Sequence, residues 1–257
     1  MRTHRAKLTL AGLAVIAVAL LATPILTGAG EAAKADKPIK AVVLTGGHGF
    51  QQKPFVAMFD AMDGIEATHV ALKDHSEVFE DVSDWPYDAI VLYNMTQRIS
   101  EKRQKNFLAL LDKGVGLVVL HHAMAAWQGW PEFRKIAGGQ FLLKPTTIDG
   151  VQYGKSGWKE GLDYTVHVTD TNHPVTRGVK DFEIHDETYC RYWVSPKTHV
   201  ILTTDEKTSD KAIGWAHTYK GAKVCYLING HDGKAYANPS YRRLIQNAIL
   251  WTAGRMN

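Results

Sequence analysis

The stretch that decides the fold is VGLVVLHH, residues 115–122. A short apolar run rich in β-branched side chains is typical of a strand that is buried on both faces. Residues 41–45 and 89–93 carry runs of the same kind, and residues 65–72 alternate like a further strand. The spacing of apolar residues predicts helices between these strands, at about residues 54–62, 100–111 and 131–137. Strands and helices that alternate in this way predict an α/β protein whose parallel sheet is joined by right-handed crossovers.

The second half of the chain has a different pattern. Strand-like stretches follow one another closely, at residues 164–168, 198–203, 212–217 and 223–228. The turn Tyr219-Lys220-Gly221 separates the last two stretches, so we expect them to form a hairpin. Asn238-Pro239 then starts a C-terminal helix with an apolar face.

Length and composition are those of one large globular domain. The chain has 257 residues, of which 45% are hydrophobic and 22% are charged, and its formal net charge is +4. This composition supports a sizeable core. No run of lysine and arginine marks a nucleic-acid surface, so we expect no nucleic-acid partner.

The first 35 residues have the order of a secretory signal peptide. Arg2, Arg5 and Lys7 precede an apolar stretch at residues 8–21, and small residues follow up to Ala35. We therefore expect an exported protein, periplasmic or extracellular. The alternative is an uncleaved anchor, because the apolar stretch approaches the ~20 residues that span a bilayer, and a membrane would then be contacted only through this segment. No cysteine lies near the leader, which excludes a lipid-modified cysteine.

The chain has two cysteines, Cys190 and Cys225. In an oxidising compartment they could pair, provided that their Cα atoms come close enough. Cys225 lies in an apolar strand-like stretch, which favours a buried and unpaired thiol. The pairing of the two cysteines stays open at this point.

Histidines follow three of the expected strands. His48 comes after the first strand, His121 and His122 after the fourth, and His231 with Asp232 after the last. In an open parallel sheet the carboxyl ends of the strands meet at one edge, where ligands bind. Imidazole can act as an acid or base near neutral pH, or ligate a metal. A single histidine at a strand end is more often structural, so the hypothesis of a site rests on the convergence of three such ends.

A second polar cluster occupies residues 182–189, FEIHDETY. Asp186 and Glu187 are adjacent, so in an extended segment they face opposite sides and only one of them points into a cleft. Glu187 and Tyr189 would share a face. The alternative is a solvated acidic turn, and the sequence leaves both open.

Aromatic side chains are frequent in the loop-rich middle section. Their faces could stack on a sugar ring, whereas the alternative is local packing that pins long loops. We take Trp127 as the candidate sugar contact. The group comprises Trp127, Trp130, Tyr153, Trp158, Tyr192 and Trp193.

Together these motifs resemble the ThuA-like, or trehalose-utilisation, family over residues 40–254. The resemblance rests on Thr45-Gly46-Gly47-His48, residues 116–123 with Trp130-Pro131, residues 173–178, residues 186–189, and Asn229-Gly230-His231-Asp232. It implies a flavodoxin-like, class I glutamine-amidotransferase-like α/β fold, a three-layer sandwich with a mainly parallel central sheet. It also implies a role in the use of trehalose or related disaccharides, through keto-sugar derivatives.

The chain departs from true glutamine amidotransferases at one position. Their nucleophilic cysteine follows the strand equivalent to residues 115–120, and His121 takes that place here. Imidazole is a poor substitute for a thiolate in acyl transfer. Glutamine hydrolysis is therefore not expected.

Our leading hypothesis is a hydrolase- or lyase-type enzyme that acts on a glycoside, disaccharide or keto-sugar derivative. The expected catalytic residues, as acid and base or as ligands of a divalent metal such as zinc, are His121, Glu187 and His231. The expected substrate contacts are His48, His122, Trp127, Asp186, Tyr189 and Asp232. The alternative is a non-catalytic carbohydrate-binding module, in which the histidines would lie apart. A serine hydrolase would need a G-x-S-x-G motif, which is absent, and a homo-oligomer is left open.

Overall fold

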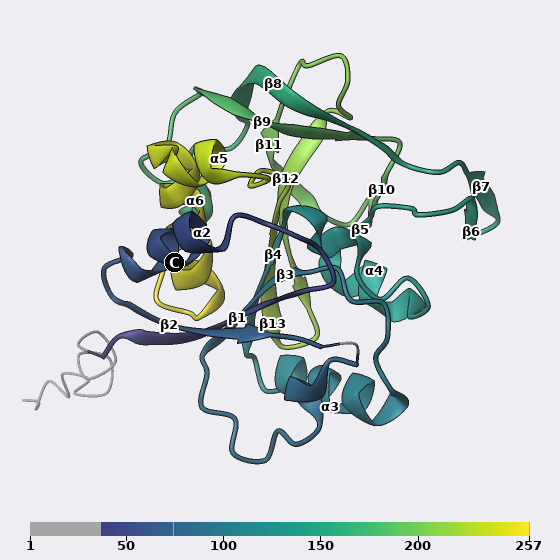
Figure 1. The fold of residues 1–257 in the computed structure, drawn as a ribbon, viewed down its shortest axis with the longest axis vertical. Coiled ribbons are helices and arrows are strands. Elements are labelled where there is room, and N and C mark those ends of the chain that lie inside the picture. The colour runs from purple at the N-terminus through teal and green to yellow at the C-terminus, as the bar shows by residue number, and fades with distance from the viewer. Residues whose placement is uncertain (1–36, 74, 257) are drawn as a thin grey trace, which may run out of the picture. The chain divides into compact units, whose positions relative to one another are not determined.

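The computed structural model describes residues 37–73 and 75–256. The residues from Lys37 onward form one compact unit (Figure 1). The predicted signal peptide, residues 1–35, lies outside the described residues and stays a prediction. Within the described ranges, no helix is both long enough and apolar enough to cross a membrane.

The centre of the fold is a nine-stranded sheet in the order β2-β1-β3-β4-β13-β12-β11-β8-β9. Neighbouring strands are parallel from β2 to β13. They are antiparallel from β13 to β9. The parallel strands are β2 (Ile65–Ala71), β1 (Ile39–Gly46), β3 (Ala89–Asn94), β4 (Gly116–Leu120) and β13 (Ala222–Leu227). The antiparallel strands are β12 (Ala212–Tyr219), β11 (His199–Thr203), β8 (Gly157–Val168) and β9 (Phe182–Cys190).

The parallel half matches the predicted sheet, whereas the other half corrects the expectation of a mainly parallel one. Neighbouring parallel strands need a crossover of about a dozen residues or more. β12 ends at Tyr219 and β13 begins at Ala222, so the predicted hairpin forms and its two strands are antiparallel. The result is a mixed α/β fold with a large central sheet.

Helices flank the strands on two sides. Figure 1 shows α2, α5 and α6 together on one side, and α3 and α4 on the other. The helices are α2 (Gln52–Asp60), α3 (Glu101–Asp112), α4 (Pro131–Ala137), α5 (Gly233–Ala237) and α6 (Pro239–Thr252), with short 3-10 helices η1 (Glu77–Phe79), η2 (His121–Ala125) and η3 (Pro174–Thr176). Two small sheets pair β5 (Gly139–Gln140) with β10 (Trp193–Val194), and β6 (Thr146–Ile148) with β7 (Val151–Tyr153).

Local sequence signals explain where two of the helices begin. Ser100 caps α3, and its hydroxyl accepts the backbone N–H of Arg103. Asn238 caps α6 by accepting two backbone N–H groups of that helix, and Pro239 occupies its first turn. The predicted C-terminal helix and the predicted start of α3 are confirmed.

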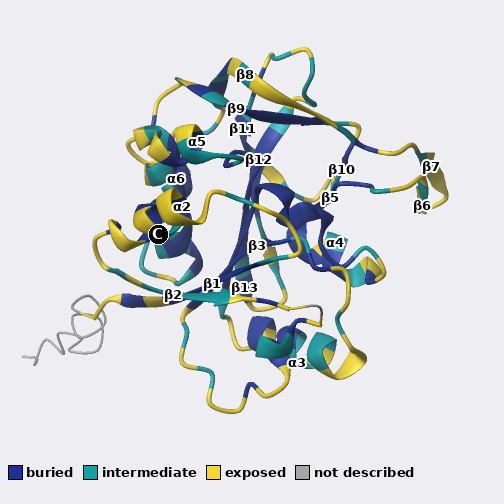
Figure 2. Ribbon diagram, viewed as in Figure 1, coloured by how far each residue is buried: buried dark blue, intermediate teal, exposed yellow. Residues whose placement is uncertain are grey.

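The core lies around the middle strands of the sheet. Every residue of β3 and β4 is buried, as their apolar runs predicted (Figure 2). Cys225 is fully buried in β13, and Cys190 is partly buried at the end of β9. Both cysteines are free, so the interpretation of Cys225 as a buried thiol is confirmed.

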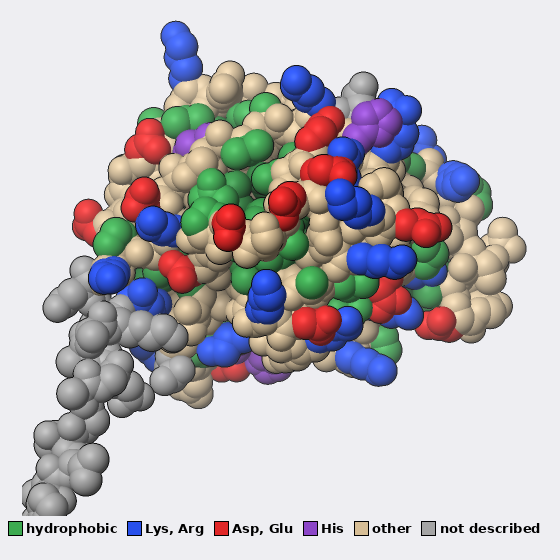
Figure 3. All heavy atoms as spheres, turned by 90° about the horizontal axis from the view of Figure 1, so that it is seen from below, with side chains coloured by type: hydrophobic (Ala, Val, Ile, Leu, Met, Phe, Trp, Pro, Cys, Tyr) green, Lys and Arg blue, Asp and Glu red, His purple; other side chains and the backbone are tan. Residues whose placement is uncertain are grey.

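Charges of both signs are interspersed on the surface. On the face shown in Figure 3, lysine and arginine side chains lie among aspartate and glutamate side chains, with hydrophobic side chains between them. The described part of this face thus lacks the extended basic area that binds a phosphate backbone.

Gly116, at the start of β4, tests how closely α6 packs on the sheet. A Cβ atom here would lie 2.5 Å from the backbone carbonyl carbon of Thr252. Because backbone atoms do not move aside easily, we expect Gly116→Ala to lower the free energy of unfolding, measured in urea, by about 1–3 kcal/mol. Gly129→Ala is the matched control, since a Cβ atom there meets nothing within 4 Å. Equal stability of the two variants would contradict this close packing.

Candidate functional site

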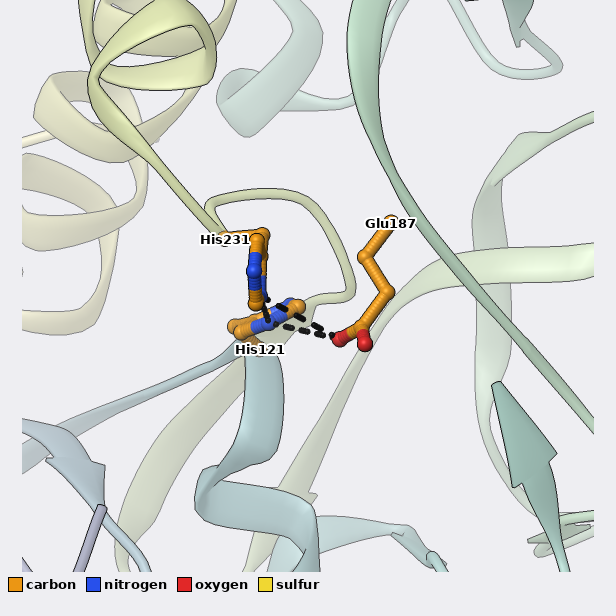
Figure 4. Close-up of side chains that lie close together, drawn as sticks. All are labelled: His121, Glu187 and His231. Carbon is orange, nitrogen blue, oxygen red and sulfur yellow. Dashed lines mark hydrogen bonds and ion pairs between the residues drawn. The ribbon is translucent and has the colours of Figure 1, made fainter. Parts of the chain in front are cut away.

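Three side chains that the sequence predicted to be functional meet at one point. His121 follows β4, His231 lies in the loop between β13 and α5, and Glu187 lies in β9 (Figure 4). His121 Nε2 lies 3.1 Å from Glu187 Oε2 and 3.3 Å from His231 Nδ1, and His231 Nδ1 lies 3.5 Å from Glu187 Oε2. Among the described residues, these three form the one group of His, Cys, Asp or Glu with the spacing of a metal site. The binding-module alternative requires the histidines to lie apart, and these two do not.

His121 is held in an unusual conformation. Its φ of 49° lies in the left-handed region, which costs free energy for a residue with a side chain. Its Nδ1 lies 2.7 Å from the carbonyl oxygen of Ile228, so Nδ1 carries a hydrogen and donates it. Its other nitrogen, Nε2, faces Glu187, His231 and, at 3.0 Å, the hydroxyl of Tyr189.

This orientation limits what can occupy the space between the side chains. In a neutral His121 ring, Nε2 presents a lone pair, which would repel the Glu187 carboxylate. The contact is favourable only when a proton or a cation lies between the two groups. Two arrangements therefore fit the geometry: an imidazolium–carboxylate ion pair, or a metal ion that is bound by all three side chains.

The donor set fits a divalent metal. Two imidazoles and one carboxylate are the protein ligands of several catalytic zinc sites. Ligands about 2.0–2.2 Å from a tetrahedral ion lie about 3.3–3.5 Å from one another, close to the three distances here. The hydrogen bond from His121 Nδ1 to Ile228 is also typical of a metal-bound histidine, because it fixes the ring and leaves Nε2 to the ion.

The charges at the site shift one another's protonation. Burial raises the pKa of Glu187, but hydrogen bonds from His121 and His231 outweigh burial and hold this pKa below its usual range. The hydrogen bond to Glu187 raises the pKa of His231, although burial opposes it. Burial lowers the pKa of His122 well below its usual range, and the charges of His121 and His48 act in the same direction. The site therefore combines a carboxylate with a neutral His122.

Asp186 positions the site without facing the cavity. Its buried carboxylate accepts the backbone N–H groups of Gly230 at 2.7 Å, His231 at 2.9 Å and Glu187 at 2.9 Å. Burial raises the pKa of Asp186, while the charge of His121 and these hydrogen bonds lower it. The expectation that Asp186 contacts a substrate is thus corrected, because the backbone occupies its oxygens. The alternative of a solvated acidic turn is wrong, because both acidic residues are buried in β9.

Two glycines let the loops of the site approach their neighbours closely. Gly47 has a φ of 75°, and a Cβ atom there would lie 2.5 Å from a backbone nitrogen after β3. Gly230 has a φ of 116°, and a Cβ atom there would lie 2.1 Å from the hydroxyl of Tyr241. A side chain is excluded at both positions, and these two turns lead directly to His48 and His231.

A cavity of about 320 Å³ adjoins the triad. His48 and His122 lie on it with their rings stacked, at a centroid distance of 4.5 Å. His122 Nε2 lies 3.1 Å from the carbonyl oxygen of Tyr93, and this contact helps to hold the His122 ring against His48. The cavity is lined by His48, Met95, His122, Ala125, Phe141, Leu143, Lys155, Trp158, Glu160, Glu187, Tyr189 and His231.

Besides Asp186, two further predicted substrate contacts lie outside the cavity lining. Trp127 is fully buried in the core, where its Nε1 donates to the Ser76 hydroxyl at 2.9 Å. Its alternative interpretation, local packing that pins a loop, is the correct one. Asp232 caps α5 by accepting the backbone N–H groups of Lys234 and Ala235, so it serves the helix that follows His231.

Several cavity residues were not predicted as site residues. Trp158, a member of the aromatic group, is 57% exposed at the cavity, between Lys155 and Glu160 in the sequence. The β8–β9 pairing sets Trp158 opposite Tyr189. The sequence offered one signal for Trp158: it is an aromatic residue in a stretch that could pair, as a strand, with residues 182–189. The register between two strands that lie apart in the chain is not visible in the sequence, so its place beside Tyr189 could not be predicted.

Solved structures of ThuA-like proteins have the same fold. A ThuA-like protein from Parabacteroides merdae matches with a TM-score of 0.70 and 19% identity, over 85% of this chain and 91% of that chain. One from Bacteroides uniformis has a TM-score of 0.61 and 20% identity, over 85% and 93%. Gan42B, a GH42 β-galactosidase from G. stearothermophilus, has a TM-score of 0.52 and 12% identity, over 84% of this chain and 30% of its own. At these identities the likeness shows the fold alone.

No curated protein matches this chain. The match to a protein family is clear, however, and spans residues 40–252. The family is ThuA, described as trehalose utilisation, and the matched range contains all the motifs on which the resemblance rests. The chain therefore belongs to the ThuA family.

Proposed function

We propose that this protein is an enzyme that cleaves a glycoside, disaccharide or keto-sugar derivative, by hydrolysis or elimination, with a divalent metal ion held by His121, Glu187 and His231. The observation that carries the proposal is the convergence of three donor atoms within 4.8 Å of one another beside the cavity. Membership of the ThuA family supports a sugar as the substrate. A cavity of about 320 Å³ is large enough for a small-molecule ligand.

Each residue of the site has a role in this proposal. A metal ion at the triad would polarise a sugar oxygen as a Lewis acid. The hydroxyl of Tyr189 and the ring of His48 orient the sugar. His48 Nδ1 donates to the carbonyl oxygen of Gly49 at 2.8 Å, which leaves its Nε2 to accept from a sugar hydroxyl. His122 supports His48 by ring stacking.

We also propose that the enzyme acts outside the cytoplasm and that its helices and sheet form a three-layer sandwich. The leader pattern of residues 1–35 supports a periplasmic or extracellular enzyme, and family membership supports the three-layer, glutamine-amidotransferase-like arrangement. Mass spectrometry of the protein from its own host tests the first point. Loss of the leader supports export, and a full-length chain in the cytosolic fraction contradicts it.

Zinc binding tests the metal site. We expect the chelator-treated protein to bind about one equivalent of Zn²⁺, and Glu187→Gln and His121→Gln to bind it at least about 100-fold more weakly, because each loses a ligand. Equilibrium dialysis with elemental analysis measures this. His167→Gln is the matched control, since His167 pairs with Asp181 at 2.8 Å on the surface. Equal zinc affinity in the wild type and all three variants would contradict the metal site.

Asp186→Asn tests the positioning of His231. The amide has one oxygen in place of two, so it cannot accept all the backbone N–H groups that the carboxylate accepts. We expect the zinc affinity to fall about 10- to 100-fold, and the free energy of unfolding to fall by about 1–3 kcal/mol. Asp181→Asn is the control, because Asp181 also accepts a backbone N–H, that of Val168, but lies before the start of β9, where its carboxylate bonds to Val168 and His167 and to none of the three expected metal ligands. Unchanged zinc affinity in Asp186→Asn would refute the positioning role.

Turnover tests the enzymatic part of the proposal. In a panel of glycosides, disaccharides and their keto derivatives, we expect the zinc-loaded wild type to cleave at least one member. Chelation should abolish this turnover, and Glu187→Gln should lower kcat at least about 100-fold, since the metal is lost with its ligand. Sugar binding that is the same in the wild type and Glu187→Gln, without any turnover, would support the binding module instead.

A further inference from the structure

The cavity lining has two chemically different parts. Its polar part lies at the triad and carries the side chains of Glu187, Tyr189 and His231. Its apolar part, the apolar wall, comprises Met95, Ala125, Phe141 and Leu143, and it begins beside the polar part, where the rings of Phe141 and Tyr189 lie 4.9 Å apart. None of these four side chains offers a strong hydrogen-bond donor or acceptor to a ligand.

Backbone polar groups of this apolar wall already have hydrogen-bond partners within the protein. The side chain of Gln128 donates from Nε2 to the carbonyl oxygens of Ala125 at 3.2 Å and Phe141 at 2.9 Å. Its Oε1 accepts the backbone N–H of Leu143 at 3.3 Å. One amide side chain thus satisfies three polar groups of the wall from outside the cavity lining, which leaves mainly apolar surface for a ligand.

Trp158 adds a flat aromatic face to the same cavity. It lies opposite Tyr189 in the β8–β9 pairing, and directly opposed residues share a face of the sheet. At 57% exposure, it and Val151 are the large hydrophobic side chains that the described residues expose to solvent. An indole that is 57% exposed leaves much of its face free for a ligand, and this one lines the cavity.

A second sugar would fit this apolar region poorly. Each of its hydroxyl groups would lose hydrogen bonds to water and find no partner on the wall, which costs free energy. Lys155 and Glu160, two exposed residues of the lining, have opposite signs and together favour neither an anionic nor a cationic group. An apolar ring, in contrast, gains from burial against the wall and from contact with the indole of Trp158.

We infer that the substrate is an amphipathic glycoside, with its sugar at the polar part of the cavity and an apolar, ring-sized aglycone against Trp158 and the apolar wall. The class is that of aryl glycosides, not disaccharides. The inference rests on the proposed function for the sugar part only. The aglycone part follows from the lining of the cavity.

Matched ligand pairs test this inference in the zinc-loaded protein by isothermal titration calorimetry. The pairs are phenyl β-glucoside with cellobiose, phenyl β-galactoside with lactose, and phenyl α-glucoside with trehalose. We expect the phenyl member of at least one pair to bind at least about tenfold more tightly than the disaccharide, as burial of one aromatic ring predicts. Equal or tighter binding of the disaccharide in every pair, or no binding by any phenyl glycoside, would overturn the inference.

Variants separate the two parts of the cavity. Trp158→Ala should abolish the preference for the phenyl member and leave the affinity for the disaccharide within about twofold, and Trp158→Phe should restore most of the preference. Val151→Ala, at an exposed apolar side chain outside the cavity lining, should change neither affinity. Equal weakening of both members by Trp158→Ala would overturn the inference, because the indole would then stack on the sugar.

Glu187→Gln distinguishes this inference from the proposed function. If this variant weakens both members of a pair equally while the phenyl preference is absent from the wild type, the sugar site stands and the aryl class fails. If Glu187→Gln leaves the sugar affinity unchanged, the proposed function fails. A phenyl preference that persists in Glu187→Gln shows that the apolar part binds its ring independently of the triad.

Discussion

The site depends on the position of one strand, β13. This strand pairs in parallel with β4 on one side and antiparallel with β12 on the other. Its register sets Leu227 beside Leu120, so the residues that follow the two strands leave the sheet at the same edge. His121 and His231 therefore meet, although 110 positions separate them. Any intervening strand would move the two chains apart by at least about 4.8 Å, more than a shared ligand allows.

The antiparallel half completes the site from the other side. Strand β9 buries two adjacent carboxylates, and each has a separate task. Asp186 accepts the backbone N–H groups of Gly230 and His231, which makes its burial tolerable and fixes the loop after β13. Glu187 brings its negative charge to the two imidazoles. The same strand presents Tyr189 to the cavity, and β8 presents Trp158 beside it. The parallel half therefore supplies the histidines, while the antiparallel half supplies the carboxylate and these two aromatic rings.

Local sequence patterns predicted much of the parallel half, because strands that are buried on both faces leave continuous apolar runs. The histidines at the site followed from where these runs end. Features that depend on which distant strands pair, and in which register, could not be predicted from the sequence. Trp127 and Trp158 occur in similar loop-rich sequence, yet the first is fully buried and the second is 57% exposed. Trp127 packs on Phe133 and donates to Ser76, whereas the β8–β9 register sets Trp158 beside Tyr189, and neither arrangement is visible in the sequence. The supporting task of Asp186 was hidden for the same reason, since its partners Gly230 and His231 lie on a distant loop.

Anomalous X-ray scattering at the zinc absorption edge tests most directly whether His121, Glu187 and His231 form a single cation site. In crystals of the zinc-loaded protein, the account predicts one strong anomalous peak about 2.0–2.2 Å from His121 Nε2, His231 Nδ1 and a carboxylate oxygen of Glu187. If the three side chains remain in contact and no peak lies between them, the triad is an imidazolium–carboxylate pair. That result would contradict the account.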